Sequence, residues 1–153
     1  MLLLLQRVTR ASVEVGGEPV GAIGPGLLVL VGIEPGDGDA EVARMSRRLL
    51  AYRVFADDQG RMNRSLADTG GGLLLVSQFT LAADTRSGSR PGFSTAAAPA
   101  EAERTFSAFV AECRALHAAG VETGRFGAHM TVSLTNDGPV TFLLRSGPPR
   151  GMV

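Results

Sequence analysis

The alternation of apolar and polar residues along the chain predicts more strands than helices. Short apolar or alternating runs, typical of strands, occur at residues 2–8, 11–15, 18–23, 27–33, 52–55, 73–76, 130–135 and 140–145. The run at 27–33 is apolar throughout, so we expect that strand to be covered on both faces. Gly16-Gly17 and Gly24-Pro25-Gly26 mark turns between consecutive strands.

Two longer segments carry the spacing of helices. The first begins near Asp39, which we expect to be its N-cap residue. The second covers residues 99–119, with Pro99 in its first turn and Gly120 after its last. Apolar residues at helical spacing are Val42, Met45, Leu49 and Leu50 in the first segment, and Phe106, Phe109, Val110, Cys113 and Leu116 in the second.

The order of these elements predicts the fold class. The chain has 153 residues, of which 44% are hydrophobic and 20% charged, and this suffices for one buried core. No repeat, linker or shift in composition divides it. We therefore expect one α+β domain over residues 1–153, in which a mainly antiparallel sheet, curled or barrel-like, packs against two principal helices.

Composition also bears on location. No apolar run approaches the roughly 20 residues that a membrane helix needs, so we expect no contact with a membrane. The apolar run at residues 1–5 has no basic segment before it and ends at Gln6-Arg7, unlike a signal peptide. The single cysteine, Cys113, allows no internal disulfide and favours a reducing compartment. We expect a cytoplasmic protein.

Charge and metal-binding residues narrow the function classes. A net charge of zero argues against strong non-specific nucleic-acid binding but not against a substrate held at one RNA end. Every basic residue is Arg, which suits phosphate contacts, although genome base composition is the simpler explanation. One Cys and two separated histidines, His117 and His129, predict no zinc site, and no cofactor motif occurs. His117, at a helix end, is expected to be a surface or capping residue.

The first candidate site is the run Ser77-Gln78-Phe79-Thr80-Leu81, which follows the apolar strand at 73–76. Backbone N–H groups released from a sheet at such a point can stabilise a developing oxyanion. The alternative is that the strand simply continues through Leu81. The Thr80 hydroxyl could be a nucleophile. Because no base accompanies it in the sequence, we favour a positioning role.

The second candidate site is Asn136-Asp137-Gly138-Pro139, between the last two predicted strands. Asn, Asp and Gly are turn formers, so a hairpin turn is the ordinary interpretation. However, Pro139 cannot donate to a ladder, and a cis X-Pro bond costs only about 0.5–1 kcal/mol. A cis Gly138–Pro139 bond would set two carbonyls side by side as a rigid wall.

Taken together, the two segments resemble the signature of the D-aminoacyl-tRNA deacylase family, in which a Ser-Gln-Phe-Thr motif and a Gly-cis-Pro motif define the active site. Further strings that look like family sequence, in order and at family spacing, lie at residues 6–8, 11–13, 23–32, 123–128 and 136–141. The resemblance covers nearly the whole chain.

The resemblance implies a hydrolase that cleaves the ester between a D-amino acid, or glycine, and the 3′-terminal adenosine of tRNA, without metal or cofactor. The adenine would lie near Phe79, with Gln78 and the backbone from Ser77 to Thr80 around the ester. Backbone amides would stabilise the oxyanion, and the RNA 2′-hydroxyl would help to activate water.

The resemblance also implies a homodimer, in which Gly138-Pro139 of one subunit reaches into the active site of the other. Its carbonyls would hold the substrate amino group and clash with an L side chain, so that selectivity comes from rejecting the wrong enantiomer. Arg7 would hold the orientation of this motif, and Met130 would line the same region.

Three departures from the family pattern are visible, and the first is the N-terminal run Leu2–Leu5, which is more apolar than expected. The Gly-, Ser- and Arg-rich stretch at 85–95 predicts a mobile surface loop, and residues 82–90 contain only Arg86 and Arg90 where family members often have Lys. His129 stands where an acidic residue is expected.

Two other functions remain open: an RNA-end binding module without turnover, and a general esterase that uses Thr80.

Overall fold

The main sheet of the protein has six strands in the computed structural model, which describes residues 1–147. The strands are β1 (Leu2–Val15), β2 (Glu18–Ile23), β3 (Gly26–Gly32), β6 (Gly72–Ser77), β7 (Val121–Thr123) and β8 (Thr131–Arg145). The predicted domain over residues 1–153 can be followed to residue 147, and residues 148–153 lie outside the described residues.

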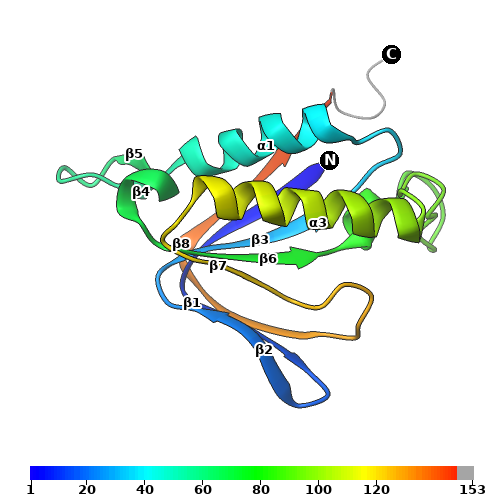
Figure 1. The fold of residues 1–153 in the computed structure, drawn as a ribbon, viewed down its shortest axis with the longest axis horizontal. Helices are drawn as coiled ribbons and strands as arrows, with labels where there is room; N and C mark the ends of the chain where they lie inside the picture. The colour runs from blue at the N-terminus through cyan, green and yellow to red at the C-terminus, as the bar shows by residue number, and fades with distance from the viewer. Residues whose placement is uncertain (148–153) are drawn as a thin grey trace.

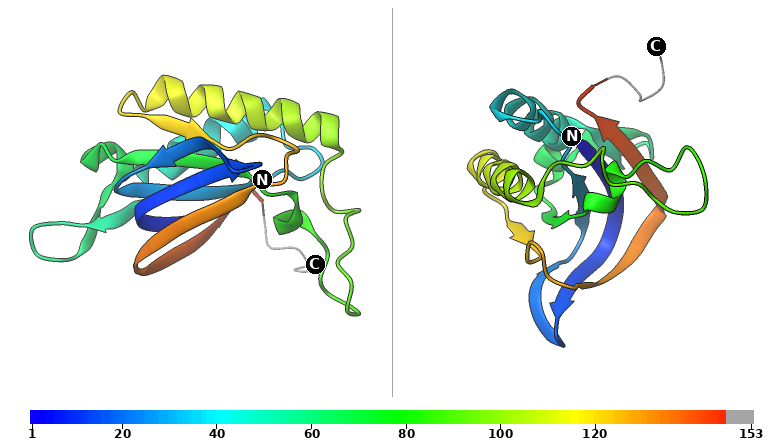
Figure 2. Two further views of the ribbon diagram at one scale, coloured as in Figure 1. Left: turned by 90° about the horizontal axis from the view of Figure 1, so that it is seen from below. Right: turned by 90° about the vertical axis from the view of Figure 1, so that its right-hand side faces the viewer.

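The long strand β1 organises the sheet. Its first half pairs with β3 and its second half with β2, while β8 pairs with both halves on the other edge, always antiparallel. Beyond β3, the pairs β3–β6 and β6–β7 are parallel. The sheet is therefore mixed, and Figure 2 shows that it curls strongly. This confirms the predicted α+β class with a curled, mainly antiparallel sheet.

Two helices, α1 (Asp39–Ala51) and α3 (Pro99–Leu116), lie side by side over one face of the sheet (Figure 1). Their apolar stripes pack on the inward residues of β1, β3 and β6, and Met45, Leu49 and Phe109 are fully buried there. Truncating one such side chain costs about 2–5 kcal/mol, so this layer fixes the position of both helices.

The face of the sheet that points away from the helices holds a second, smaller core. Its members are Val8, Ala11, Val13, Leu28, Leu74 and Val76. Successive residues of a strand point to opposite faces of the sheet. Because Leu27 and Leu28 are nevertheless both fully buried, β3 is covered on both sides. The prediction for residues 27–33 is confirmed.

Four short elements complete the fold. The strands β4 (Arg53–Ala56) and β5 (Met62–Ser65) form a separate hairpin that projects from the main body (Figure 1). The helix α2 (Leu66–Thr69) and the 3-10 helix η1 (Phe79–Ala82) flank β6. The apolar pattern missed β5 because three of its four residues are polar, and missed β7 because it has only three residues. No helix in residues 1–147 is long and apolar enough to cross a membrane.

The predicted hairpin turn at Asn136–Pro139 is wrong. Residues on both sides of it pair with β1 in the same sense, Val8 with Asn136 and Gln6 with Thr141. The chain therefore does not reverse. Instead, the four residues 137–140 bulge from β8 opposite the single residue Arg7. The two strands predicted at residues 2–8 and 11–15 are also one continuous strand, β1.

Three smaller predictions also need correction. The N-cap of α1 is Gly38 rather than Asp39, and its N–H donates to the Glu41 carboxylate at 2.9 Å. Helix α3 ends at Leu116, so 99–119 was too long, with His117 as the C-cap. His117 is a cap as expected, but it is buried, and its Nε2 lies 2.7 Å from the carbonyl oxygen of Gly71.

Candidate active site

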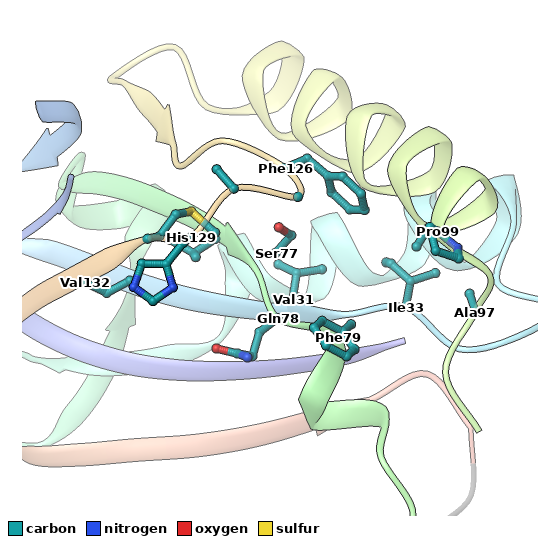
Figure 3. A pocket seen from close by; sticks show the side chains of 15 residues that line it. Val31, Ile33, Ser77, Gln78, Phe79, Ala97, Pro99, Phe126, His129 and Val132 are labelled. Atoms are coloured by element: carbon teal, nitrogen blue, oxygen red, sulfur yellow. The ribbon is translucent and has the colours of Figure 1, made fainter. Parts of the chain in front are cut away.

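A pocket of about 430 Å³ lies where the carboxyl ends of the parallel strands β3 and β6 meet the start of α3 (Figure 3). This edge of a parallel pair is where α/β sheets commonly bind ligands. The walls are mainly apolar, with Val31, Ile33, Ala97, Phe126 and Val132 among them. Ser77, Gln78 and His129 are the polar side chains of the lining within the described chain.

The strand β6 ends abruptly at this pocket. The Gln78 N–H donates to the Val31 carbonyl at 2.8 Å, and the chain then turns into η1. Gly32 permits this turn, because a Cβ there would lie 3.0 Å from Cβ of Leu81 and 3.3 Å from the Gln78 carbonyl oxygen. The alternative interpretation, a strand continuing to Leu81, is thus wrong.

Two backbone N–H groups at this turn are available to a ligand. Within residues 1–147, the N–H groups of Phe79 and Thr80 donate to no protein acceptor, whereas those of Gln78, Leu81 and Ala83 all do. They are free because the first N–H groups of a helical turn have no partner within it. Paired donors of this kind can stabilise an oxyanion.

The Thr80 hydroxyl has one partner within the described chain. Nε2 of Gln78 donates to Oγ1 of Thr80 at 2.6 Å. The hydroxyl oxygen therefore accepts a hydrogen bond from an amide, and no His, Asp or Glu of residues 1–147 bonds to it. A nucleophilic hydroxyl needs a base that accepts its proton, so this environment suits a positioning residue better.

The segment between β7 and β8 forms the opposite wall of the pocket. The N–H of Arg125 donates to the sulfur of Met130 at 3.4 Å, which holds Met130 against the segment. His129 is exposed and lines the same pocket as Gln78 (Figure 3). Among the lining residues of the described chain, His129 is the one titratable group.

Within the described chain, neither a reactive thiol nor a metal-binding cluster lies at this site. The chain's one cysteine, Cys113, lies in the core, and burial raises its pKa to about 12, so the thiol stays protonated. In residues 1–147, no group of three or more His, Cys, Asp or Glu side chains is placed to hold a metal ion.

The second motif lies in the bulge of β8. The Gly138–Pro139 bond is cis, and both residues are exposed. Arg7 braces the bulge, because Nε donates to the Asp137 carbonyl at 2.8 Å and Nη1 donates to the Val54 carbonyl of β4 at 2.7 Å. The Val140 N–H donates to Oδ1 of Asn136 at 2.8 Å, which closes the base of the bulge.

This motif is remote from the pocket of its own chain. On β1, Arg7 is opposite Leu27 of β3, whereas the pocket residue Val31 is opposite Leu3. Four residues along a strand correspond to about 13 Å. The pocket thus brings together Ser77, Gln78, Phe79 and Met130, and Thr80 is hydrogen-bonded to Gln78. The other predicted site residues, Arg7, Gly138 and Pro139, lie elsewhere.

Sequence reasoning missed most of the apolar wall. Ala97, Pro99 and Phe126 line the pocket but were not candidates. In the sequence, Pro99 indicates only the start of a helix, and Phe126 is only part of a string that resembles family sequence. No local signal marks them, because they reach the pocket through the packing of α3 and the segment after β7 on β3 and β6.

Comparison with known proteins finds relatives that match nearly the whole chain. The model of the family described as D-Tyr-tRNA(Tyr) deacylase matches residues 4–145. A D-aminoacyl-tRNA deacylase of Xanthomonas axonopodis pv. citri (strain 306) is 72% identical over 145 residues, covering 95% of this chain and 99% of that one. One of Stenotrophomonas maltophilia (strain K279a) is 73% identical over the same shares.

Solved structures agree in fold. One described as c-Myc DNA Unwinding Element Binding Protein superposes with a TM-score of 0.92 at 41% identity, covering 97% of this chain and 100% of the other. A second, described as a probable eukaryotic D-amino acid tRNA deacylase, has a TM-score of 0.82 at 16% identity over 94% of this chain and 97% of the other. At that identity, the second likeness concerns the fold alone.

Proposed function

The chain belongs to the D-aminoacyl-tRNA deacylase family and is an ester hydrolase, and from this we propose that it cleaves the ester between the 3′-terminal adenosine of tRNA and a D-amino acid or glycine. The observation that carries the proposal is the pair of free N–H groups at Phe79 and Thr80, next to an apolar pocket. The reaction would take place in the cytoplasm, where charged tRNA is found.

The pocket suits the terminal nucleoside. Its volume of about 430 Å³ and its mainly apolar walls are typical of sites for small ligands. The adenine lies among the apolar side chains near Phe79, with Ser77 and Gln78 at the polar end towards the ester. Polar groups are few there, so the position of the ester is set by the backbone turn at residues 77–80.

The reaction proceeds through a tetrahedral intermediate. A water molecule, oriented by the 2′-hydroxyl of the RNA, attacks the ester carbonyl carbon. The negative charge that develops on the carbonyl oxygen is stabilised by the N–H groups of Phe79 and Thr80. The bond to the ribose 3′-oxygen then breaks, this oxygen takes up the proton that the attacking water has released, and the free amino acid leaves.

Thr80 acts as a positioning residue and not as a nucleophile. Its hydroxyl accepts from Gln78, and this bond holds the Gln78 side chain over the turn that presents the two N–H groups. No acyl-enzyme forms in this scheme, because the water molecule attacks the ester directly.

We further propose that the pocket is completed by a second copy of the chain. The cis Gly138–Pro139 unit is exposed and lies about 13 Å along the sheet from its own pocket, so it is free to enter a partner's pocket. There its carbonyls bind the substrate amino group and exclude an L side chain. A hydrogen atom fits the same space, so glycine is accepted.

A deacylation assay with paired substrates tests this function. The protein is expected to release D-Tyr and Gly from tRNA while L-Tyr-tRNA survives. Equal loss of the D and L esters would contradict the stereochemical scheme. Binding of charged tRNA without turnover would favour an RNA-end binding module instead. Turnover of simple esters that lack a ribose, abolished in Thr80→Ala, would favour the general esterase.

A further inference from the structure

Two phenylalanine rings stand in the solvent beside the pocket. Phe79, which also lines the pocket, is 58% exposed, and Phe93 is 45% exposed. Their ring centroids are 5.2 Å apart, with a tilt of 50° between the rings. Together they form an aromatic surface that continues outward from the pocket wall.

The loop that carries Phe93 is anchored to the site. Asp84 and Gly92 exchange two backbone hydrogen bonds of 2.7 and 2.9 Å, and the Thr95 hydroxyl donates to the Ala82 carbonyl at 2.6 Å. Directly afterwards, the N–H of Ala97 donates to the carbonyl of Ile33 at 3.1 Å, and both residues line the pocket. The position of Phe93 is therefore set by the same structure that forms the pocket.

The charge of this loop suits a phosphate backbone. Residues 85–95 include Arg86 and Arg90 and no acidic residue. The neighbouring Asp84 is paired with Arg86 at 2.7 Å, which raises the pKa of that guanidinium and leaves little net negative charge at the base of the loop. Arg90 is exposed and can contact a phosphate.

We propose that Phe93, together with Phe79, forms a stacking surface for the base of the nucleotide that precedes the terminal adenosine. Exposed aromatic rings commonly stack on the unpaired bases of single-stranded RNA. The pocket has room for about one nucleoside, so the preceding nucleotide must lie outside it. Phe79 is the lining residue that continues into the exposed aromatic surface. This inference rests on the proposed function, because it takes the substrate to be the 3′ end of tRNA.

The test compares two D-tyrosyl esters, one on full-length tRNA and one on adenosine alone. Phe93→Ala should lower kcat/KM for the tRNA ester about 5- to 100-fold, through KM, and leave the adenosine ester unchanged. Phe93→Tyr, which keeps a ring, should behave like the wild type. Leu116→Ala is the matched control, because Leu116 is equally exposed at 45% but lies at the far end of α3.

Two results would overturn the inference: unchanged KM for the tRNA ester in Phe93→Ala, or an equal loss on both esters. Calorimetric titration distinguishes failure of the stacking inference from failure of the proposed function. The wild type should bind the unacylated trinucleotide CCA more tightly than adenosine, and Phe93→Ala should remove the difference. If the wild type hydrolyses neither ester, the proposed function fails, and the titration still decides whether Phe93 stacks on a base.

Discussion

In the proposed mechanism, Phe79 and Thr80 stabilise the oxyanion through their backbone N–H groups. The resemblance of Ser77–Thr80 to a family motif can be recognised from the sequence. The position of this motif directly after a buried strand can be recognised as well. What the sequence does not state is which N–H groups are free. That depends on the Gln78 N–H being taken by Val31, a residue that lies 47 positions earlier in the chain.

Removing one free N–H group tests this role. Phe79→Pro deletes the N–H, and proline is tolerated at the first position of a helical turn. Gln78, with φ −141° and ψ 83°, lies outside the α region that a following proline disfavours. Phe79→Ala keeps the N–H and serves as the control for loss of the ring. The proline variant should lose about 10²–10³-fold in kcat relative to the alanine variant. Equal kcat values for the two would contradict oxyanion stabilisation by this group.

Thr80 is expected to be helpful but dispensable. Thr80→Val keeps the shape of the side chain and loses the hydrogen bond from Gln78. One neutral hydrogen bond is worth about 1 kcal/mol, so single-turnover rates should fall about fivefold. If turnover disappears, or if an acyl-enzyme can be trapped on the wild type, Thr80 is a nucleophile after all.

Cys113 is expected to be unreactive in the native protein. Because burial raises its pKa to about 12, almost no thiolate is present at about pH 8, and the sulfur is shielded in the core. A thiol reagent should therefore modify the urea-unfolded chain quickly and the native protein slowly. Rapid modification of the native protein at full activity would show that this part of α3 opens readily.

At the scale of elements, the bulge in β8 is the feature that local sequence could not reveal. Asn136-Asp137-Gly138-Pro139 has the composition of a hairpin turn, and turn formers serve equally well in a bulge. Only the pairing of both flanks with β1 distinguishes the two. By contrast, α1 and α3 can be predicted from the sequence apart from the N-cap of α1 and the end of α3, because their apolar stripes are long and regular.

Arg7 connects this bulge to the β4–β5 hairpin through two carbonyls on different elements. Arg7→Lys keeps the charge, but a single ammonium group lacks the fork that reaches both acceptors. We expect the free energy of unfolding to fall by about 1 kcal/mol. We expect a proportionally larger fall in the preference for D-Tyr-tRNA over L-Tyr-tRNA. Arg10→Lys is the control, because Arg10 lies on the same strand with one hydrogen bond of 3.4 Å. Similar effects of both substitutions would argue against a special role for Arg7.

At the scale of the whole molecule, the fold class followed from the element pattern, but the arrangement of the site did not. Ser77 and Gly138 lie on strands of one sheet, and only the register with β1 shows that they are far apart. The outer strand β8 is exposed along most of its length, with Leu134, Phe142 and Leu143 among the exposed apolar residues. Such an edge is a favourable surface for pairing with another chain.

Mixed dimers test the shared site most directly. One subunit carries Phe79→Pro and the other Gly138→Ala, in which the added Cβ would lie 2.6 Å from Cγ2 and N of Val140, at a φ of +153°. If the motif acts in the partner's pocket, one of the two pockets is intact. The purified heterodimer should then hydrolyse D-Tyr-tRNA at about half the wild-type rate, with wild-type protection of L-Tyr-tRNA. Activity and D-over-L discrimination no better than those of the Gly138→Ala homodimer would contradict a pocket completed by the second subunit.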